Sequence, residues 1–332
     1  MVSAMPSRQP VFVDVDTGVD DALALVYLLA SGEAELVGIA STGGNVGVEQ
    51  VCQNNLSLLD LCQAHDIPVS KGAAQPRNGA MCPPGKAHGA NGLGYAVLPP
   101  SARRLTDYDA ATAWVQAARG YPGELIGVAT GPLTNLALAL RAEPALPTLL
   151  RRLVIMGGAY DYRGNTNPVA EWNIHVDPEA AAEVFAGWVG AESLPVLCGL
   201  DLTQQIAMTP EHLRRLASIA DGSNPLIRFI EDSMRFYFEA HRDAGYGYLA
   251  HLHDPLAAAV ALDPQLVSTR AATVDVELTG SLTRGMTVTD WSGRWGRKPN
   301  ALIGVGVDPA VFFDRFIDRV GAFARSLTPD YS

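Results

Sequence analysis

The stretch PVFVDVDTGVDDALALVYLLAS, residues 10–31, contains a strand pattern, a short polar turn and a helix pattern in immediate succession. Residues 10–15 are mostly apolar and rich in valine, which predicts a buried strand. Residues 20–31 are apolar on almost every side, which predicts a buried helix. A buried strand followed directly by a helix is the repeating unit of a parallel α/β sheet.

The same alternation continues through the first 200 residues. Predicted strands cover 34–42, 67–72, 124–130, 152–158 and 194–201, and further predicted helices cover 48–64, 109–119, 132–143 and a segment after 177–178. Short, fully apolar strands that alternate with helices are typical of a sheet covered on both faces. We therefore predict an α/β fold with an open, mostly parallel, Rossmann-like sheet and helices on both faces.

The second half of the chain is more helical and ends with a small strand pair. Helical patterns cover 209–220, 224–243, 255–262 and 309–327, and strand patterns cover 272–280 and 285–291. No linker, internal repeat or low-complexity segment divides the chain, so we predict a single domain over 10–327 with flexible termini at 1–9 and 328–332. The loop over 73–100, rich in Gly, Pro and Asn, is long enough to suggest a function.

The composition argues against several classes of protein. A net charge of −11 without a dense run of Lys or Arg argues against a nucleic-acid-binding protein. The four cysteines show neither paired nor zinc-type spacing, which fits a reducing compartment and predicts a cytoplasmic location. No apolar run is long enough for a membrane span, and the N-terminal MVSAMPSRQP lacks the apolar stretch of a signal peptide.

Four carboxylates lie within eight positions at the end of the first predicted strand, namely Asp14, Asp16, Asp20 and Asp21. Two like charges about 4 Å apart repel by roughly 4 kcal/mol at an effective dielectric constant near 20. A bound cation would remove this repulsion. Alternatively, Asp20 or Asp21 caps the following helix and the other carboxylates face water. The stretch alone leaves both interpretations open.

Polar or glycine-rich turns follow three other predicted strands, at 42–45 (TGGN), 130–132 (TGP) and 156–158 (MGG). Ligands of open α/β sheets bind outside the carboxyl ends of the strands, so we expect these turns to converge on one crevice. Steric demands of tight turns explain the glycines. They do not explain the acids and amides.

Two later segments add candidate side chains. NTNPVAEWN (165–173) carries carboxamides and a carboxylate, which suit the binding of hydroxyl groups, although a polar surface loop has the same composition. HLHDPLAAAVAL (251–262) places Asp254 and Pro255 ahead of an apolar helix. From the residues alone, the favoured interpretation of Asp254 is a helix N-cap, with Pro255 in the first turn.

Taken together, DVDTGVDDA, TGGN, ATGPLTNLALAL, VIMGG, NPVAEWN and HDPLAAAVA resemble, in this order and spacing, the inosine–uridine-preferring nucleoside hydrolases. The resemblance extends from about Pro10 to Phe323. It implies hydrolysis of the N-glycosidic bond of a ribonucleoside to ribose and free base. It also implies a homo-oligomer, either a dimer or a tetramer. One departure is Thr17, where many relatives carry Pro.

The resemblance further implies a Ca²⁺ site. By similarity the ion is bound by Asp16, Asp21, Asp254 and the main-chain carbonyl of Thr130, with ribose hydroxyls and one water completing the shell. Coordination by oxygen alone suits Ca²⁺. Asp20 would be the general base that takes a proton from a metal-bound water. Asp14 would support the site from behind.

The resemblance also assigns the substrate contacts. The residues implied for the ribose are Asn45, His88, Met156, Asn165, Glu171 and Asn173. Carboxylates and amides around the sugar would favour an oxocarbenium-like transition state. His253 is the candidate that protonates the leaving base, because imidazole is an acid near neutral pH.

Base preference, purine or pyrimidine, stays open at this point. Four further residues could stack on a base or donate to it, namely Tyr237, His241, Tyr246 and Tyr248. We interpret each of them as an ordinary side chain on the surface of a helix or of the loop that follows it.

Three alternative functions remain to be weighed. One is hydrolysis of another N-riboside, and another is a non-catalytic Ca²⁺- or sugar-binding protein, which would leave Asp20 and His253 without an evident role. The third is a phosphatase of the haloacid dehalogenase type. Its motif requires Thr or Val where this chain has Gly18, so the phosphatase is disfavoured.

Overall fold

The computed structural model describes residues 8–82, 86–220 and 223–327. The predicted flexible termini lie outside these residues, apart from Arg8 and Gln9. Gln9 is the first residue of strand β1.

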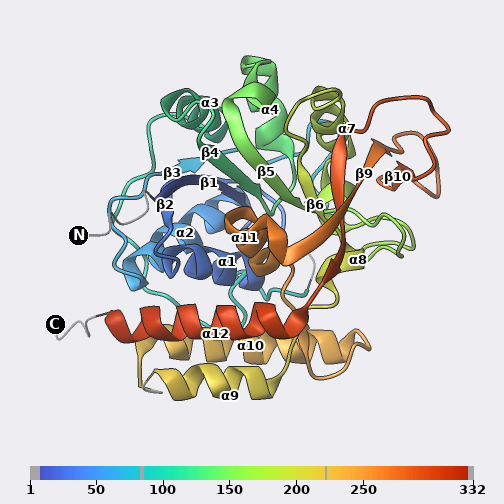
Figure 1. Ribbon diagram of the computed structural model, residues 1–332. Coiled ribbons are helices and arrows are strands. Elements are labelled where there is room, and N and C mark those ends of the chain that lie inside the picture. Colours follow the sequence, from blue (N-terminus) through green and yellow to red (C-terminus); the bar gives the residue numbers. More distant parts are fainter. Residues whose placement is uncertain (1–7, 83–85, 221–222, 328–332) are drawn as a thin grey trace, which may run out of the picture.

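Within the described residues, one nine-stranded sheet has the order β10-β9-β11-β6-β5-β4-β1-β2-β3 (Figure 1). Its strands are β1 (Gln9–Val15), β2 (Ala34–Ser41), β3 (Val69–Lys71), β4 (Leu125–Ala129), β5 (Leu150–Met156), β6 (Val196–Cys198), β9 (Val267–Val276), β10 (Thr287–Asp290) and β11 (Ala301–Val307). All neighbours from β3 to β11 pair in parallel, whereas β9 pairs antiparallel with both β11 and β10. The predicted mostly parallel α/β sheet is confirmed.

Helices cover both faces of the sheet. They are α1 (Val19–Leu29), α2 (Val48–Leu61), α3 (Ala110–Gly120), α4 (Thr134–Ala142), α5 (Leu146–Leu149), α6 (Trp172–Val176), α7 (Pro178–Gly187), α8 (Leu200–Thr203), α9 (Pro210–Ile219), α10 (Pro225–Asp243), α11 (His253–Leu262) and α12 (Pro309–Ser326). Figure 1 shows α3, α4 and α7 on one face, α1, α2 and α11 on the other, and α9, α10 and α12 as a further layer beyond α1.

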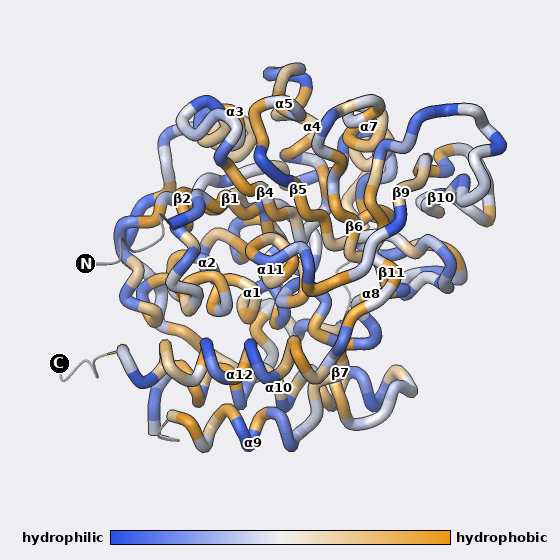
Figure 2. The backbone as a smooth tube through the Cα atoms, viewed as in Figure 1, coloured by the Kyte–Doolittle hydropathy of each residue, from blue (hydrophilic) through white to orange (hydrophobic). Residues whose placement is uncertain are grey.

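Two helices are buried on nearly all sides because they lie inside this layering. The helix α1 packs against α10, α11 and α12, and α11 packs against α1, β4 and β5. Every residue of α11 from Asp254 onward is buried, and its run of alanines lets the helix approach the sheet closely. Figure 2 shows the central strands and α11 as mainly hydrophobic. Among the described residues, no helix is long and apolar enough to span a membrane.

The C-terminal strand pair differs from the prediction in its connections. The pair exists as β9 and β10, but β9 begins at Val267 and is joined to the main sheet by β11, which pairs with β6. We did not predict β11, because Gly304 and Gly306 interrupt its apolar pattern and Val305 between them is exposed. A separate ribbon pairs β7 (Ala207–Met208) with β8 (Ala250–His251), and it positions the segment just before α11.

Candidate active site

The carboxyl ends of β1, β2, β4 and β5 lie side by side, because these strands are parallel neighbours in the sheet. A cavity of about 240 Å³ opens at this edge. Liquid water occupies about 30 Å³ per molecule, so the cavity has room for a small organic ligand. Its lining includes ten of the predicted site residues, namely Asp20, Asn45, His88, Thr130, Met156, Asn165, Glu171, Asn173, His253 and Asp254.

Three carboxylates converge at the floor of the cavity. One oxygen from each of Asp20, Asp21 and Asp254 lies within 4.8 Å of the others. Asp254 comes from α11, which begins at His253 with Leu252 as its N-cap. The interpretation of Asp254 as the helix cap is therefore wrong, because Asp254 lies inside the first turn and faces the other acids. Asp20, the predicted base, belongs to this group of three, whereas Asp16, a predicted ligand, is not one of its members.

The two predicted metal ligands that do not line the cavity, Asp16 and Asp21, are held from behind it. Asp21 Oδ2 accepts a hydrogen bond from the Gly18 N–H at 2.9 Å, and Asp21 Oδ1 accepts one from the Thr130 hydroxyl at 2.7 Å. Asp16 Oδ2 accepts from the Asn45 N–H at 2.7 Å. Asp16 Oδ1 is buried and has no hydrogen-bond partner among the described residues. Such an oxygen is costly unless a further group binds it.

Burial and mutual repulsion shift the titration of these acids. Burial, followed by the charge of Asp21, raises the pKa of Asp20 from its ordinary 3.8 to about 8. The same two causes raise the pKa of Asp16 well above its usual value. Burial and the charges of its three acidic neighbours do the same to the pKa of Asp254. No Lys or Arg is among the described residues that line the cavity, so nothing there compensates the negative charge.

These observations fit a hard cation. The acids offer carboxylate oxygens, one of which has no hydrogen-bond partner among the described residues, and the carbonyl of Thr130 is the further ligand predicted above. That carbonyl accepts a hydrogen bond from Asn173 Nδ2 at 2.6 Å and keeps a second lone pair. Oxygen donors alone suit Ca²⁺ better than Zn²⁺.

Asp14 is separate from this group. Its carboxylate accepts hydrogen bonds from Trp114 Nε1 at 2.8 Å and Asn135 Nδ2 at 2.9 Å, and it does not line the cavity. Burial raises the pKa of Asp14 to about 6, although these two hydrogen bonds lower it. The same Asn135 amide contacts the Ser41 carbonyl at 3.2 Å, so Asp14 helps to fix the ends of β1 and β2 relative to each other.

The positions of the Asp16 carboxylate and the His88 ring require glycine at residues 44 and 18. A Cβ on Gly44 would lie 2.1 Å from Asp16 Oδ2, and a Cβ on Gly18 would lie 2.5 Å from His88 Nδ1. Neither glycine has a positive φ, so the reason is space rather than backbone conformation. The TGGN turn therefore sets the position of the Asp16 carboxylate.

The variant Gly44→Ala tests this close approach. We expect it to destabilise the fold by about 1–3 kcal/mol, because the added methyl group must displace the Asp16 carboxylate. Gly32→Ala is the matched control, since a Cβ there meets nothing within 4 Å, its φ is not positive, and it lies in the turn between α1 and β2. Thermal unfolding of both variants measures the difference. Equal melting temperatures would show that the turn has space to relax.

Two of the predicted ribose-binding side chains, Glu171 and Asn173, lie at the start of α6. Glu171 is the N-cap of α6, and its carboxylate accepts hydrogen bonds from the N–H groups of Asn173, Ile174 and Gly158. Asn173 Nδ2 donates to the carbonyls of Thr130 and Met156. These bonds tie α6 to the ends of β4 and β5. Asn165 is exposed and accepts from the Trp172 N–H at 2.9 Å, which leaves its amide nitrogen free to donate.

His88 enters the cavity from the predicted functional loop. Its Nδ1 accepts a hydrogen bond from the Val19 N–H at 3.0 Å, so the proton of the neutral ring is on Nε2. Nδ1 also lies 3.7 Å from Asp20 Oδ1, a distance typical of an ion pair. We do not regard this contact as one, because burial lowers the pKa of His88 to about 3 and leaves the ring uncharged.

The aromatic residues of α10 and the following loop divide into two groups. Tyr237, His241 and Tyr246 line the cavity. Tyr237 is only 3% exposed, and its hydroxyl lies 3.4 Å from Asp20 Oδ2. The interpretation of Tyr237 and His241 as surface residues is wrong, because both are buried and line the cavity. Tyr248 packs on Phe238, is 45% exposed and does not line the cavity.

His253 lies beside the acids and is fixed by a residue that the sequence did not suggest. Its Nδ1 lies 2.7 Å from the hydroxyl of the buried Thr203 on α8. Burial, followed by the neighbouring histidines, lowers the pKa of His253 well below its ordinary value. The ring is therefore neutral near pH 7. The prediction that His253 is a charged acid near neutral pH therefore does not fit its buried position.

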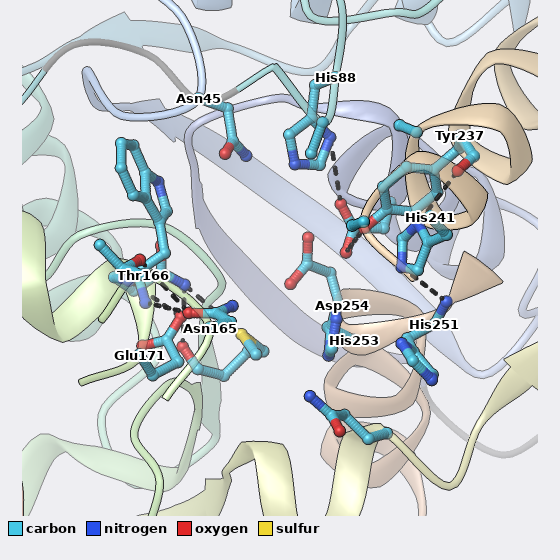
Figure 3. A pocket seen from close by; sticks show the side chains of 18 of the residues that line it. Asn45, His88, Asn165, Thr166, Glu171, Tyr237, His241, His251, His253 and Asp254 are labelled. Atoms are coloured by element: carbon cyan, nitrogen blue, oxygen red, sulfur yellow. Dashed lines mark hydrogen bonds and ion pairs between the residues drawn. The ribbon is translucent and has the colours of Figure 1, made fainter. Parts of the chain in front are cut away.

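Figure 3 shows how the two ends of the cavity differ. Asn165, Thr166 and Glu171 lie on one side, Tyr237, His241 and His251 on the other, and Asp254 between them. The sequence analysis missed several lining residues, namely Thr166, Trp172, Gln204 and His251. Only His251 carried a signal, since it stands two positions before His253. The other three depend on how loops fold over the cavity.

Comparison with known proteins gives a consistent result. The family model of the inosine-uridine preferring nucleoside hydrolases matches residues 11–314. The pyrimidine-specific ribonucleoside hydrolase RihA of Salmonella paratyphi C (strain RKS4594) is 38% identical over 316 residues, which cover 95% of this chain and 99% of the relative. RihA of Escherichia coli O9:H4 (strain HS) is also 38% identical over 316 residues, with the same coverage.

The names of two similar proteins of solved structure give purine nucleosides, whereas the RihA names give pyrimidines. A purine-preferring ribonucleoside hydrolase from Gardnerella vaginalis superposes with a TM-score of 0.89 and 34% identity, covering 96% of this chain and 100% of that one. An inosine-guanosine nucleoside hydrolase superposes with a TM-score of 0.85 and 32% identity, covering 94% and 98%.

Proposed function

The chain belongs to the inosine-uridine preferring nucleoside hydrolase family and is a hydrolase of ribonucleosides, and on this premise we propose that it uses Ca²⁺, with Asp20 as general base and His253 at the leaving base. The single observation that supports the cation most strongly is the buried Asp16 Oδ1, which has no hydrogen-bond partner among the described residues and whose carboxylate is repelled by Asp21 and Asp20. Family membership disfavours the non-catalytic alternative.

The proposed ligands of Ca²⁺ are the carboxylates of Asp16, Asp21 and Asp254 and the carbonyl of Thr130. When bound, the ion lowers the pKa of water and can coordinate vicinal hydroxyl groups. Asn45, Asn165, Glu171, Asn173, Met156 and His88 are the proposed contacts of the ribose. The protein groups around the sugar are carboxylates, amides and carbonyls, which favour a sugar carbon that develops positive charge as the base departs.

Asp20 is the proposed acceptor of the proton from the attacking water. It lines the cavity, whereas Asp16 and Asp21 do not. The Tyr237 hydroxyl contacts one of its oxygens, which fixes the orientation of the carboxylate. The water oxygen bonds to the anomeric carbon, the bond from that carbon to the base nitrogen breaks, and the water proton passes to Asp20.

His253 is the proposed hydrogen-bond donor to the leaving base. If the Thr203 hydroxyl donates to Nδ1, the neutral ring presents Nε2–H to the cavity. This hydrogen bond stabilises the negative charge that develops on the base as its bond to the sugar breaks. The base leaves as an anion with the electron pair of that bond, and it takes a proton from water after release. A homo-oligomer and a cytoplasmic location remain predictions.

The role of His253 is tested by changing the leaving group. We expect His253→Gln to lower kcat on nucleosides by about 10²-fold, because the base must then depart without its donor. On 4-nitrophenyl riboside, whose leaving group is a stable anion, we expect a much smaller loss. Steady-state kinetics on both substrates measure the ratio. An equal loss on the two would assign His253 to sugar binding or to folding.

The proposed cation is tested by the pH dependence of stability. In the unfolded chain Asp20 ionises near its ordinary pKa of 3.8, whereas in the cation-free fold its pKa is about 8. Between these values the folded state binds more protons than the unfolded chain, so the cation-free protein loses stability as the pH rises. Ca²⁺ replaces those protons. We therefore expect Ca²⁺ to raise the melting temperature more at pH 8 than at pH 5, and a gain independent of pH would argue against binding at these carboxylates.

A further inference from the structure

Three histidines meet at the end of the cavity away from the proposed sugar contacts. They are His241 on α10, His251 on β8 and His253 on α11, and one ring nitrogen from each lies within 4.8 Å of the others. All three line the cavity, and Figure 3 shows His241 and His251 on the side opposite Glu171. The proposed reaction uses only His253. Two imidazoles at this end therefore have no assigned role.

The rings are held in a way that is typical of metal-binding histidines. His241 Nδ1 donates to the Tyr237 carbonyl at 3.0 Å, so Nε2 carries the lone pair. Within the described part of the chain, that Nε2 accepts a single hydrogen bond, a long one of 3.3 Å from the His251 N–H. The Thr203 hydroxyl beside His253 Nδ1 can accept as well as donate, so Nε2 of His253 can also present a lone pair. Metal-ligating histidines commonly bond an oxygen through the other ring nitrogen.

The charges around the three rings favour a cation. Burial lowers the pKa of His251 to about 4 and lowers that of His241, so both rings are neutral near pH 7. Asp20 and Asp254 also line the cavity, whereas no Lys or Arg does so among the described residues. A divalent ion that enters the cavity is therefore attracted to this end and meets unprotonated nitrogen.

We propose that His241, His251 and His253 bind a transition-metal ion of the Zn²⁺ type, at a site distinct from the oxygen-lined Ca²⁺ site. Imidazole nitrogen suits Zn²⁺, Cu²⁺ and Ni²⁺, whereas Ca²⁺ takes oxygen ligands. With Zn–N bonds of about 2.0–2.1 Å, the donors of a tetrahedral site lie roughly 3.3 Å apart. Small rotations of the side chains bring the present spacing to that value.

A metal ion at this site would occupy the end of the cavity where the base of a nucleoside is expected. Three histidines leave the fourth position of a tetrahedral ion open to water or to a ligand atom. The ion would also take the His253 nitrogen that donates to the leaving base. Zn²⁺ would therefore inhibit hydrolysis in competition with the nucleoside. This inhibition rests on the proposed function, whereas the binding of the metal does not.

The binding is tested on the full chain in excess Ca²⁺, with Zn²⁺ by calorimetry and with Co²⁺ by visible absorption. We expect one Zn²⁺ per chain, with the affinity lowered at least about tenfold in His251→Gln. His251→Cys replaces the imidazole by a thiolate ligand, so we expect it to retain binding and to give a sulfur-to-cobalt charge-transfer band. His65→Gln is the matched control, because the His65 side chain is 61% exposed and does not line the cavity.

Three results would overturn the metal site: no Zn²⁺ binding to the Ca²⁺-loaded chain, binding that Ca²⁺ displaces, or equal affinity in His251→Gln and the unmodified chain. The inhibition is measured separately, as a Zn²⁺ effect on nucleoside hydrolysis that added nucleoside relieves and added Ca²⁺ does not. Zn²⁺ binding without inhibition would overturn the claim that the metal blocks the base end. A chain with no nucleosidase activity would contradict the proposed function alone, because the titrations decide the metal site.

Discussion

Asp20→Asn is expected to lower kcat on ribonucleosides by about 10²–10⁴-fold while the affinity for Ca²⁺ stays within a few-fold of the unmodified chain. The substitution keeps the shape of the side chain and its contact with Tyr237, but the amide cannot accept a proton from water. Steady-state kinetics with calorimetric titration of Ca²⁺ measure the two quantities on the same preparation. The control is Asp60→Asn, which makes the same change to a carboxylate near the end of α2.

Asp16→Asn distinguishes the proposed general base from the proposed cation ligands. Because Asp16 Oδ1 is buried without a partner, we assign it to the cation, and its amide variant should lose Ca²⁺ affinity along with turnover. The opposite pattern would reverse the two roles. If Asp16→Asn bound Ca²⁺ normally without turnover, and Asp20→Asn retained turnover, then Asp16 would be the base.

Asp254→Asn is expected to have opposite effects on activity and on stability. We expect the affinity for Ca²⁺ to fall by at least about 10–100-fold, since even residues that only orient metal ligands contribute that much. Turnover falls with it at limiting Ca²⁺. The cation-free variant, however, should melt at a higher temperature than the unmodified cation-free chain. One of the carboxylates that repel each other in the buried cluster has been removed.

The stability gain of Asp254→Asn should grow with pH. At pH 5 protons neutralise the cluster in both proteins, whereas at pH 8 the unmodified fold must still bind protons that the unfolded chain has released. Thermal unfolding in the presence of a chelator at the two pH values measures this. A loss of stability at pH 8 would mean that the Asp254 carboxylate holds the fold together rather than binding an ion.

The order of strands and helices was predictable because the apolar pattern within each element indicates which of its sides are buried. The strand β1 and the helix α1 are mostly apolar, and the structure buries nearly all of their residues. The strand β11 was not predictable in the same way. Its glycines carry no side-chain pattern, and its place between β6 and β9 depends on pairing with residues far away in the sequence.

The acidic end of the site could be predicted in part from the sequence, because several of its residues directly follow strands. Asp16, Asn45 and Thr130 each stand at a strand end, so the parallel sheet brings them together whatever the loops do. Asp254 was misassigned from the residues alone, because its spacing to Pro255 is also that of a helix cap. Only the resemblance to a family gave it a metal role. The packing of α11 on α1 then places Asp254 beside Asp21.

The histidine end of the cavity could not be predicted from the sequence. Its residues come from segments outside the main sheet, so strand pairing in that sheet does not determine their positions. Tyr237 and His241 are one turn apart on α10, and nothing in an amphipathic helix says which of its buried residues face a cavity. His251 is positioned by its pairing with Ala207, a two-residue ribbon too short to be recognised in a sequence. Thr203 lies on a helix of four residues.

The central claim is that a cation held by the aspartates at the end of β1 and by Asp254 is needed to hydrolyse ribonucleosides. The most direct test is chromatographic measurement of free base released from a panel of purine and pyrimidine ribonucleosides, with Ca²⁺, with a chelator, and with Ca²⁺ restored. We predict release from at least one nucleoside, lost with the chelator and regained with Ca²⁺, and the panel ranks the bases. Undiminished release from a chain shown to be free of metal, or no release from any nucleoside by a chain shown to bind Ca²⁺, would contradict the account.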